Sequence, residues 1–417
     1  LDALEDTSVY YLCDERGATH NARRFAAQCA AALDDITPDV DGFVEAFQYL
    51  TARVDGPCVV ALDEFSYLVD EDDTIPSVFQ TVVDDVLAGT DVSLVLLGSS
   101  ISMMEEGVLS YESPLYGRRT GQWELAPLSF ADVRAFFPDD DLETQIQLYS
   151  VLGGVPAYLE QFDPGLSLLE NIEQSILSKG EFLYEEPEFL LRQELREPAT
   201  YMAILEAIAG GATRVTEIAN EIGRDASSLS RYLQNLTQLA ILEREHPVTD
   251  PDGRGLYRLT DDFLRFWFRF VEPNRSSIEE APEMVYEGTI APRLADHVSS
   301  TFEDICQEAI WEAIRQGELD PYADLGRWWY GEQEIDIVGL APSDDRILFG
   351  ECKWTTEPVG HGLVDSLVEK ADDVRWGPAD RTESFALFSR SGFVDCLADD
   401  VDGNWSLFGP EELSTLL

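Results

Sequence analysis

A lysine and two carboxylates in the C-terminal part of the chain have the types and spacing of a metal-dependent hydrolytic site. Lys353 is one of only three lysines among the 28 basic residues, and it follows Glu351 by two positions. Mg²⁺ binds one or two carboxylates together with waters and substrate phosphate, and a nearby ammonium group can orient an attacking water. With Asp336 as the second carboxylate, this is the chemistry of phosphodiester cleavage. The sequence therefore predicts that Asp336 and Glu351 hold Mg²⁺ and that Lys353 is catalytic.

A predicted β-hairpin brings these three side chains together. The runs 334–340 and 347–354 are rich in β-branched and apolar residues, and the residues between them include Pro, Ser and two Asp, as turns do. A symmetric hairpin places Asp336 opposite Glu351, where like charges repel and a cation would resolve the repulsion. Strand side chains alternate between faces, so Lys353 shares the face of Glu351. The alternative is an ordinary surface hairpin with solvated acids.

Two other titratable residues lie near this hairpin in sequence. Glu303 falls in a helix predicted at 298–314, and it is either a further metal ligand or a solvated helix acid. His361 lies in a predicted loop flanked by glycines, and we assign it no role.

A second acidic pair follows a predicted central strand near the N-terminus. Residues 58–62, Cys-Val-Val-Ala-Leu, are apolar on both faces, as in a parallel sheet, and Asp63 and Glu64 come next. Ligands of α/β sheets bind beyond the carboxyl ends of the strands, where an aspartate can hold Mg²⁺ and a glutamate can activate water. We therefore predict that Asp63 binds ATP-bound Mg²⁺ and that Glu64 is catalytic, which is Walker B chemistry. A plain strand exit is the alternative.

Two later residues extend this predicted ATP site. Ser99 follows the next strand, at 92–98, where it could sense the γ-phosphate, and Arg118 could contact the nucleotide in the same chain or across a subunit interface. No G-x-x-x-x-G-K-[ST] loop is present and no lysine precedes Lys179, so the phosphate cradle is missing from these residues. We expect either that such a loop precedes Leu1 or that the module has lost nucleotide binding, and the abrupt start favours the first.

The elements around these residues predict an α/β protein of several modules. Strands near 8–13, 58–63 and 92–98 alternate with helices, which indicates a parallel sheet. The expected domains are an ATPase core without its Walker A segment, a helical linker or lid, a winged helix-turn-helix and a C-terminal α/β domain, at residues 1–165, 166–194, 195–275 and 276–417.

The winged helix is predicted from helices near 201–209, 215–222 and 227–239 and from two strands around a turn at 250–254. The third helix of such folds meets the major groove of DNA. The segment 195–275 has ten arginines and twelve acidic residues, a net charge of −2, whereas the rest of the chain carries −51. DNA could approach here, through the predicted contacts Arg224, Ser227, Ser228, Arg231 and Arg254. A winged helix that docks only to protein is the alternative.

Composition points to the cytoplasm of a halophile. Hydrophobic residues make up 45% of the chain, enough for packed cores, so the net charge of −53 does not indicate disorder. Such a charge repels itself at low ionic strength, but the Debye length falls to about 3 Å in molar salt. An acidic mesophilic protein is the alternative.

Cysteine usage and hydropathy exclude several classes of protein. The six cysteines form no C-x-x-C pair and share no ligand spacing with the four histidines, so neither structural zinc nor a disulfide scaffold is predicted. No apolar run approaches the roughly 18 residues of a membrane span, and no signal peptide is recognised.

Four segments follow one another in an order that is typical of one group of ATPases. They are 59–65, 96–100, 115–118 and 153–159, the last reading Gly-Gly-Val-Pro-Ala-Tyr-Leu. The chain thereby resembles the archaeal-type P-loop ATPases of the AAA-like and STAND lineage, with the first segment as Walker B and the second, through Ser100, as the sensor strand. The P-loop segment of that family is not among these residues.

That family often carries, after the winged helix, a domain of unknown function that looks like the restriction-endonuclease fold. Glu303, Asp336, Glu351 and Lys353 fall on its PD-(D/E)XK pattern, so the resemblance implies Mg²⁺-dependent nuclease geometry. We therefore expect an ATP-binding, DNA-associated protein with a nuclease-like effector, as a homo-oligomer or with a protein partner. One alternative is a non-enzymatic regulator or scaffold that only grips DNA or a partner. In another alternative the ATPase domain is still a switch, but the winged helix and the C-terminal domain bind protein partners.

Overall fold

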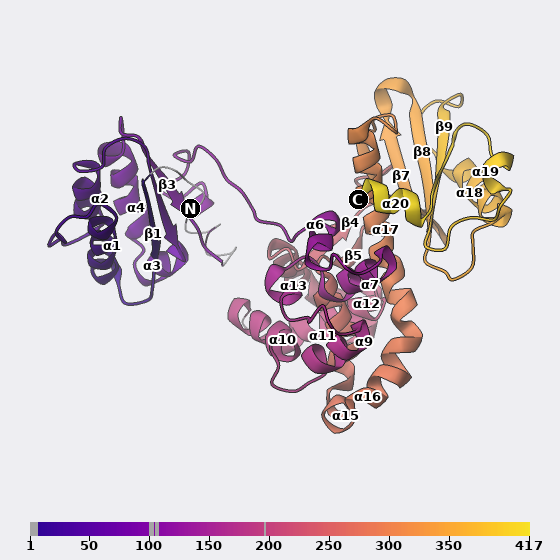
Figure 1. Cartoon of the computed structure of the whole chain (residues 1–417), viewed down its shortest axis with the longest axis horizontal. Helices are drawn as coiled ribbons and strands as arrows, with labels where there is room; N and C mark the ends of the chain where they lie inside the picture. Colours follow the sequence, from indigo (N-terminus) through magenta and orange to yellow (C-terminus); the bar gives the residue numbers. More distant parts are fainter. Residues whose placement is uncertain (1–6, 100–103, 105–107, 196) are drawn as a thin grey trace. The chain divides into compact units, whose positions relative to one another are not determined.

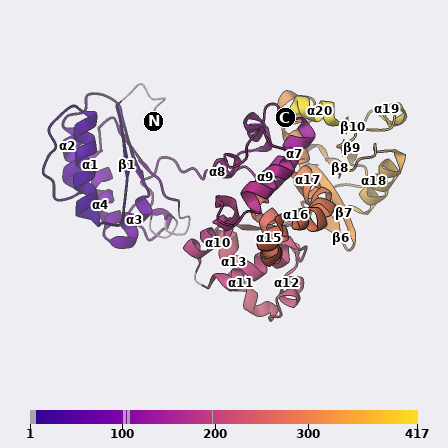
Figure 2. The same cartoon turned by 60° about the horizontal axis from the view of Figure 1, so that its bottom comes forward.

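The computed structural model describes residues 7–99, 104, 108–195 and 197–417 of the chain. The chain divides into two compact units, Leu1–Leu125 and Ala126–Leu417. Both are drawn in Figure 1 and Figure 2.

The first unit is built on a three-stranded parallel sheet with the order β1-β2-β3. Strand β2, Cys58–Asp63, pairs with β1, Thr7–Leu12, on one side and with β3, Val92–Leu96, on the other. The prediction of a central strand that ends at Asp63 is confirmed. Because parallel strands end at the same edge of a sheet, the residues after β2 and β3 meet there.

Helices pack on one face of this sheet. The helices of the unit are α1 Ala18–Ala32, α2 Phe43–Thr51, α3 Phe65–Glu71 and α4 Ile75–Thr81, and α4 continues as a π-helical turn, Val82–Val86. Along β1, Val9 and Tyr11 are buried against phenylalanines of α1, α2 and α4, whereas Tyr10 and Leu12 point the other way and are half exposed. In the described part of the unit, the residues at the strand ends are therefore positioned by a sheet whose one face packs on helices.

The second unit begins with a helical region. Its elements are α6 Phe130–Val133, a 3₁₀ turn Arg134–Phe136, α7 Leu142–Leu152, α8 Pro156–Leu159, α9 Leu168–Asn171, a π-helical turn Ile172–Ile176 and α10 Phe182–Glu194. The segment expected as a linker or lid, 166–194, thus contains α9, the π-helical turn and α10, and the buried residues of the turn and of α10 share one hydrophobic cluster with α7.

The winged helix-turn-helix has the predicted order of elements. It consists of α11 Pro198–Ala209, α12 Val215–Glu221, α13 Ala226–Gln238, β4 Leu242–Glu245 and β5 Leu256–Leu259. Strands β4 and β5 pair antiparallel around the predicted wing. Leu229, Leu233 and Leu236 recur at helical spacing and are buried, so the opposite face of α13 is left to solvent.

An aromatic helix follows and fills the core of this region. It comprises α14 Asp262–Phe266 and a π-helical turn Trp267–Val271, and its five aromatic side chains are fully buried. They lie in the same hydrophobic cluster as α7, α10 and α11, so this helix packs against each of these elements. The chain then passes through a 3₁₀ turn Glu272–Asn274, α15 Arg275–Glu280, α16 Pro282–Val285 and a π-helical turn Tyr286–Ile290.

The C-terminal region is a five-stranded mixed sheet with the order β10-β9-β8-β7-β6. The strands are β6 Asp324–Tyr330, β7 Gln333–Ala341, β8 Arg346–Lys353, β9 Thr382–Ser389 and β10 Trp405–Phe408. The first three form an antiparallel meander, and β9 and β10 are parallel to β8. The predicted hairpin is the β7–β8 pair, and its symmetric register is confirmed.

One helix covers each face of this sheet (Figure 1). Helix α17, Ala291–Gln316, packs on Ile337, Leu348 and Cys352, and helix α18, His361–Asp373, packs on the opposite face. Two short helices, α19 Leu397–Asp400 and α20 Pro410–Leu416, and a 3₁₀ turn Pro342–Asp344 complete the region. No helix in the described ranges is long and apolar enough to cross a membrane.

Candidate functional site

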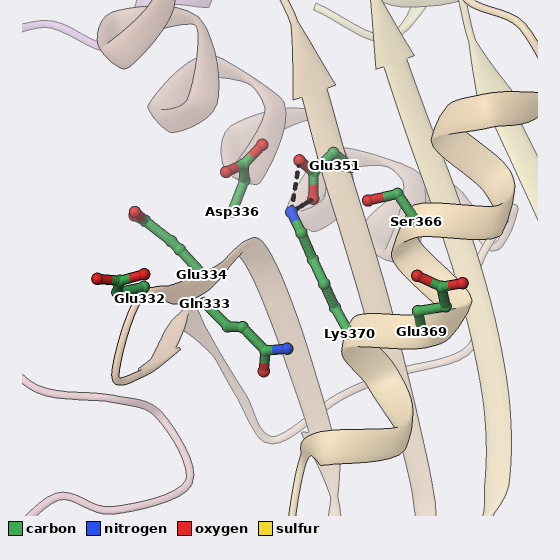
Figure 3. A pocket seen from close by; sticks show the side chains of 8 residues that line it. All are labelled: Glu332, Gln333, Glu334, Asp336, Glu351, Ser366, Glu369 and Lys370. Carbon is green, nitrogen blue, oxygen red and sulfur yellow. Dashed lines mark hydrogen bonds and ion pairs between the residues drawn. The ribbon is translucent and has the colours of Figure 1, made fainter.

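The predicted carboxylates Asp336 and Glu351 meet at an acidic pocket beside the C-terminal sheet. Strands β7 and β8 are paired as far as Ile337 opposite Gly350, so Asp336 and Glu351 come next on the two strands. The Asp336 carboxylate accepts a hydrogen bond from the backbone N–H of Cys352 at 2.8 Å. The pocket has a volume of about 450 Å³. Figure 3 shows its lining residues, Glu332, Gln333, Glu334, Asp336, Glu351, Ser366, Glu369 and Lys370.

Two lysines hold the Glu351 carboxylate. Lys353 donates to Oε1 of Glu351 at 2.8 Å, as its place on the same face of β8 predicts. Lys370 of α18 donates to both oxygens at 2.9 Å (Figure 3). Glu351 is 4% exposed, and a carboxylate so far from water needs such partners.

Sequence reasoning did not identify Lys370, because nothing in the local sequence ties α18 to the hairpin. Composition offered a signal, since the scarcity of lysine that singles out Lys353 applies equally to Lys370. The neighbouring prediction of a loop at His361 is wrong, since His361 is the first residue of α18.

Burial and charge shift the proton equilibria of this cluster. Burial and the charge of Glu351 raise the pKa of Asp336 to about 6. Burial lowers the pKa of Lys353, but the neighbouring Glu351 and Asp336 carboxylates together outweigh this effect, so the net pKa is raised. Above about pH 6, the pocket therefore holds an ionised Asp336, and the Lys353 that pairs with Glu351 is charged.

Glu303 lies on α17. Its carboxylate pairs with an arginine and does not line the pocket. Its carboxylate pairs with Arg327 of β6 at 2.6 Å, and the pocket lining within the described ranges does not include it. Burial raises the pKa of Glu303 to about 8; Arg327 opposes the rise, and the charge of Asp336 adds to it. The predicted third ligand, Glu303, is thus within electrostatic reach of Asp336 but is already paired.

Arg327 also connects this region to the winged helix, which the sequence did not indicate. Its guanidinium lies 3.5 Å from Glu245 of β4 and 3.5 Å from Asp304 of α17. Asp304 in turn accepts a hydrogen bond from Arg258 of β5 at 3.0 Å. One arginine therefore faces three carboxyl groups. Its single positive charge is shared among them, which explains why the pKa of Glu303 stays raised.

The donor set of the pocket fits a hard divalent cation. Asp336 and Glu351 bring carboxylate oxygens from adjacent strands to one cavity, and Glu332 and Glu334 line the same cavity. Mg²⁺ prefers such oxygen ligands. The hydrogen bond from Cys352 uses one Asp336 oxygen, Oδ2.

At the other candidate site, the ends of β2 and β3 bring together Asp63, Glu64 and Ser99. The Ser99 hydroxyl donates to Oε2 of Glu64 at 2.9 Å, and the Tyr10 hydroxyl donates to Oδ2 of Asp63 at 2.5 Å. Glu64 has a φ of 52°, in the left-handed region that non-glycine residues seldom adopt. The three predicted strand-end residues are therefore neighbours, and Tyr10 is a partner that the sequence did not indicate.

Arg118 is engaged elsewhere in the first unit. Its Nε and Nη2 donate to the Asp84 carboxylate at 2.9 and 2.8 Å, and its Nη1 donates to the Pro114 carbonyl at 2.7 Å. In the described part of the unit, no hydrogen bond or ion pair links Arg118 to Asp63 or Glu64. Ser100, the last residue of the predicted sensor segment, lies outside the described residues.

The predicted DNA contacts lie on the open side of the winged helix. Arg224 is exposed, and its guanidinium donates to the Thr200 hydroxyl at 3.0 Å. The Ser228 hydroxyl donates to the Asp225 carbonyl at 2.7 Å. The predicted contacts exposed on α13 and the wing are Ser227, Ser228, Arg231 and Arg254.

Three family models match successive parts of the chain. Residues 2–162 match an ATPase domain predominantly from Archaea. Residues 201–246 match the IclR helix-turn-helix domain, and residues 267–365 match a family described as Archaea bacterial proteins of unknown function. The chain thus combines an ATPase-type domain with a helix-turn-helix domain of DNA-binding type.

Two solved structures are similar to the chain at low identity. The Walker-type ATPase PABY2304 of Pyrococcus abyssi is 19% identical, with a TM-score of 0.47 and coverage of 63% of this chain and 84% of that one. The ORC1 protein of Aeropyrum pernix, solved in complex with DNA, is 14% identical, with a TM-score of 0.30 and coverage of 67% and 80%.

Two curated relatives come from Methanocaldococcus jannaschii. One uncharacterized protein is 43% identical over 60 residues, which are 14% of this chain and 58% of that protein. Another is 35% identical over 349 residues, which are 83% of this chain and 77% of that protein. This second similarity extends through most of both chains. The chain therefore belongs to the same family of archaeal ATPase-domain proteins as this M. jannaschii protein.

Proposed function

We propose that the C-terminal sheet domain is a Mg²⁺-dependent nuclease-type effector that the winged helix brings to DNA and the ATPase-type domain controls. The observation that carries this proposal is the convergence of Asp336, Glu351 and Lys370 at one pocket, with Lys353 paired to Glu351. Carboxylates that can hold a divalent cation, together with a nearby ammonium group, suit phosphodiester hydrolysis. A helix, an antiparallel meander, a crossover helix and a parallel strand follow in order, which supports the resemblance to the restriction-endonuclease fold.

Each of these four side chains has its own part in the proposed reaction. Asp336 and Glu351 would hold the divalent cation, which when bound supplies positive charge to the phosphate. Lys353 would position the attacking water and stabilise the negative charge that develops on the phosphate. Lys370 would neutralise Glu351 before the cation binds, since it reaches both oxygens.

The proposed ATP site lies at the ends of β2 and β3. Asp63 would hold the Mg²⁺ that accompanies ATP, Glu64 would activate water, and Ser99 would sense the γ-phosphate. The hydrogen bond between Ser99 and Glu64 supports a coupled pair of this kind. Arg118 would have to leave Asp84 before it could contact a nucleotide.

Cleavage of duplex DNA with Mg²⁺ in concentrated KCl tests the nuclease assignment. We expect Lys353→Ala to lower the cleavage rate by about 100- to 1,000-fold, the loss that follows removal of one preorganised electrostatic group. Lys179→Ala is the matched control, because Lys179 is an exposed lysine paired with Glu279, and its rate should equal that of the parent. A Lys353→Ala variant that cleaves as fast as the parent overturns the assignment.

A non-enzymatic regulator or scaffold is the second candidate, and the acidity of the pocket favours it. Five of the eight lining residues are acidic and one is a lysine, so the pocket by itself repels a polyanion. Simple binding to DNA or a partner should survive EDTA. Undiminished DNA binding in EDTA, without cleavage at any Mg²⁺ concentration, selects this candidate over the nuclease.

DNA affinity measured across a range of KCl concentrations tests the winged helix. Each phosphate contact adds about −0.9 to the slope of log K against log salt. We expect Arg231→Ala and Arg254→Ala each to reduce the magnitude of the slope by about 1. Arg315→Ala, at an exposed arginine of α17, is the control. No detectable affinity at any salt concentration assigns the winged helix to a protein partner.

A further inference from the structure

A second group of potential metal ligands lies at the start of α18. One ring nitrogen of His361, Sγ of Cys396 and a carboxylate oxygen of Asp400 all lie within 4.8 Å of one another, and all three residues are exposed. Nε2 of His361 is 3.0 Å from Oδ2 of Asp400. Three different ligand types therefore converge at one point of the surface.

The backbone fixes the two segments that carry these ligands. Val359 and Phe393 form an isolated parallel β-bridge, and the N–H of Val394 donates to the Val359 carbonyl at 3.0 Å. The N–H of Asp400 donates to the Cys396 carbonyl at 3.1 Å. Residues four apart on a helical turn share a face, so Cys396 and Asp400 point the same way. The ligand positions are thus set by main-chain contacts as well as by side-chain rotamers.

We propose that His361, Cys396 and Asp400 form a binding site for a zinc-type divalent ion. Histidine nitrogen, cysteine thiolate and carboxylate are the protein ligands of Zn²⁺, and tetrahedral bonds of about 2.0–2.3 Å place the ligand atoms about 3.3–3.8 Å apart. The three side chains therefore need to close by only about 1 Å around an ion of this size. A fourth position stays open for water or another ligand. Imidazole and thiolate select a zinc-type ion over Mg²⁺, which prefers oxygen ligands.

This site is distinct from the proposed nuclease pocket but shares α18 with it. Lys370 lies nine residues after His361, about 13 Å along the helix. An ion bound by His361 and Cys396 would fasten the start of α18 to α19, and so would hold the helix that delivers Lys370 to Glu351. No spacing in the sequence indicated the site, because strand β9 lies between the ligands and the fold alone brings them together.

The accessibility of the cysteines allows a site-specific test on the full chain. All six cysteines are described and free; five are buried, and Cys396 is exposed. A thiol reagent should therefore modify one cysteine of the native protein quickly. With excess Mg²⁺ present to occupy surface carboxylates, one equivalent of Zn²⁺ should suppress this modification. An unchanged modification rate overturns the proposal.

Co²⁺ provides a spectroscopic probe of the same three ligands. We expect thiolate-to-cobalt charge-transfer absorption in the parent and none in Cys396→Ser. His361→Ala and Asp400→Asn should each weaken Co²⁺ binding by at least about 10-fold. Loss of a hydrogen-bond partner of a metal ligand already weakens binding by about this factor, and these residues are ligands themselves. Asp399→Asn, an exposed neighbour on α19 outside the ligand group, is the matched control and should bind as the parent does. Because the substituted side chains are exposed, circular dichroism should show folded variants. Equal absorption in the parent and Cys396→Ser overturns the site.

Discussion

The two candidate sites use the same acidic residue types at very different burial. At the strand ends of the first unit, Asp63 and Glu64 are partly exposed, and their partners are the hydroxyl groups of Tyr10 and Ser99. In the C-terminal domain, Glu351 is almost completely buried, and its partners are two ammonium groups. Water can solvate the first pair of acids, whereas the protein itself has to supply counter-charge for Glu351.

This contrast predicts different energetics for the two sites. Exposed ion pairs contribute little to stability in general, whereas removing one partner of a buried pair leaves an uncompensated charge. The two units can be followed separately, because Trp123 is the one tryptophan of eight in the first unit and is 84% exposed. Tryptophan fluorescence therefore reports mainly the unfolding of the second unit.

The largest effect is expected at Arg327, the arginine shared by Glu303, Asp304 and Glu245. Arg327→Met should lower the free energy of unfolding of the second unit by about 3–5 kcal/mol, because Asp304 and Glu245 lose a shared counter-charge and the buried Glu303 carboxyl loses its partner. Urea unfolding in concentrated KCl, followed by tryptophan fluorescence, measures this loss.

Arg118→Met is the matched control in the first unit, where the Arg118–Asp84 pair is open to solvent. Hydrogen exchange of the first unit should be nearly unchanged in this variant. If Arg118→Met were as damaging as Arg327→Met, burial would not be what separates the two regions.

The next largest effect concerns the pH dependence of stability. The pKa of Glu303 is raised from an ordinary 4.5 to about 8. Between these values the folded protein keeps a proton that the unfolded chain has released, so the free energy of unfolding falls as the pH rises through this window. Glu303→Gln should remove that part of the decline, a change on the order of a few kcal/mol. Urea unfolding at pH 5 and pH 8 compares the variants.

Glu318→Gln is the control for this experiment, because Glu318 is exposed just beyond α17 and should leave the pH profile unaltered. A decline that persists in Glu303→Gln would mean that Arg327 keeps Glu303 ionised in the folded protein. The positive charge of Arg327 would then be sufficient for Glu303, in spite of the two other carboxylates that it faces.

A smaller effect is expected when Lys370 is removed. Lys370 occupies both oxygens of Glu351, so it competes with a cation for them. Lys370→Met should destabilise the cation-free domain and tighten Mg²⁺ binding by about 10-fold, equivalent to about 1.4 kcal/mol. The rise in unfolding midpoint with added Mg²⁺ measures this gain, with Lys179→Met as the control. Weaker Mg²⁺ binding in Lys370→Met would show that the lysine assists the cation.

The parts of the fold that could be predicted from the sequence depend on local pattern. Strands and helices of the first unit and the winged helix follow from apolar periodicity and turn residues, and the β7–β8 register follows from one short turn. Strands β6, β9 and β10 escaped prediction. The parallel pairing of β9 with β8 requires α18 as a crossover, and such a contact between distant segments leaves no local pattern.

The site residues that were predicted lie close together in sequence or on one hairpin, whereas those that were missed come from distant elements. Asp63 and Glu64 are adjacent in sequence, and Asp336 faces Glu351 because a hairpin fixes the pairing. Lys370 and Arg327 reach the cluster from other elements, and their approach depends on how α18 and β6 pack. A buried carboxylate signals that a counter-charge must exist, but the sequence alone does not say which residue provides it.

The smallest effect is expected at the strand ends of the first unit. Ser99→Ala removes the hydrogen bond to Glu64, but water can replace the lost hydroxyl at an exposed position, so the cost should be about 1 kcal/mol or less. Hydrogen exchange of peptides from 58–99 measures the change, and Ser93→Ala, at an exposed serine of β3, is the control. Faster exchange throughout the unit would mean that Glu64 depends on its partner as strongly as Glu351 depends on its lysines. Exchange that changes only beside Ser99 would place the difference between the two sites in solvation: water compensates the acids of the first unit, and lysines compensate Glu351 in the second.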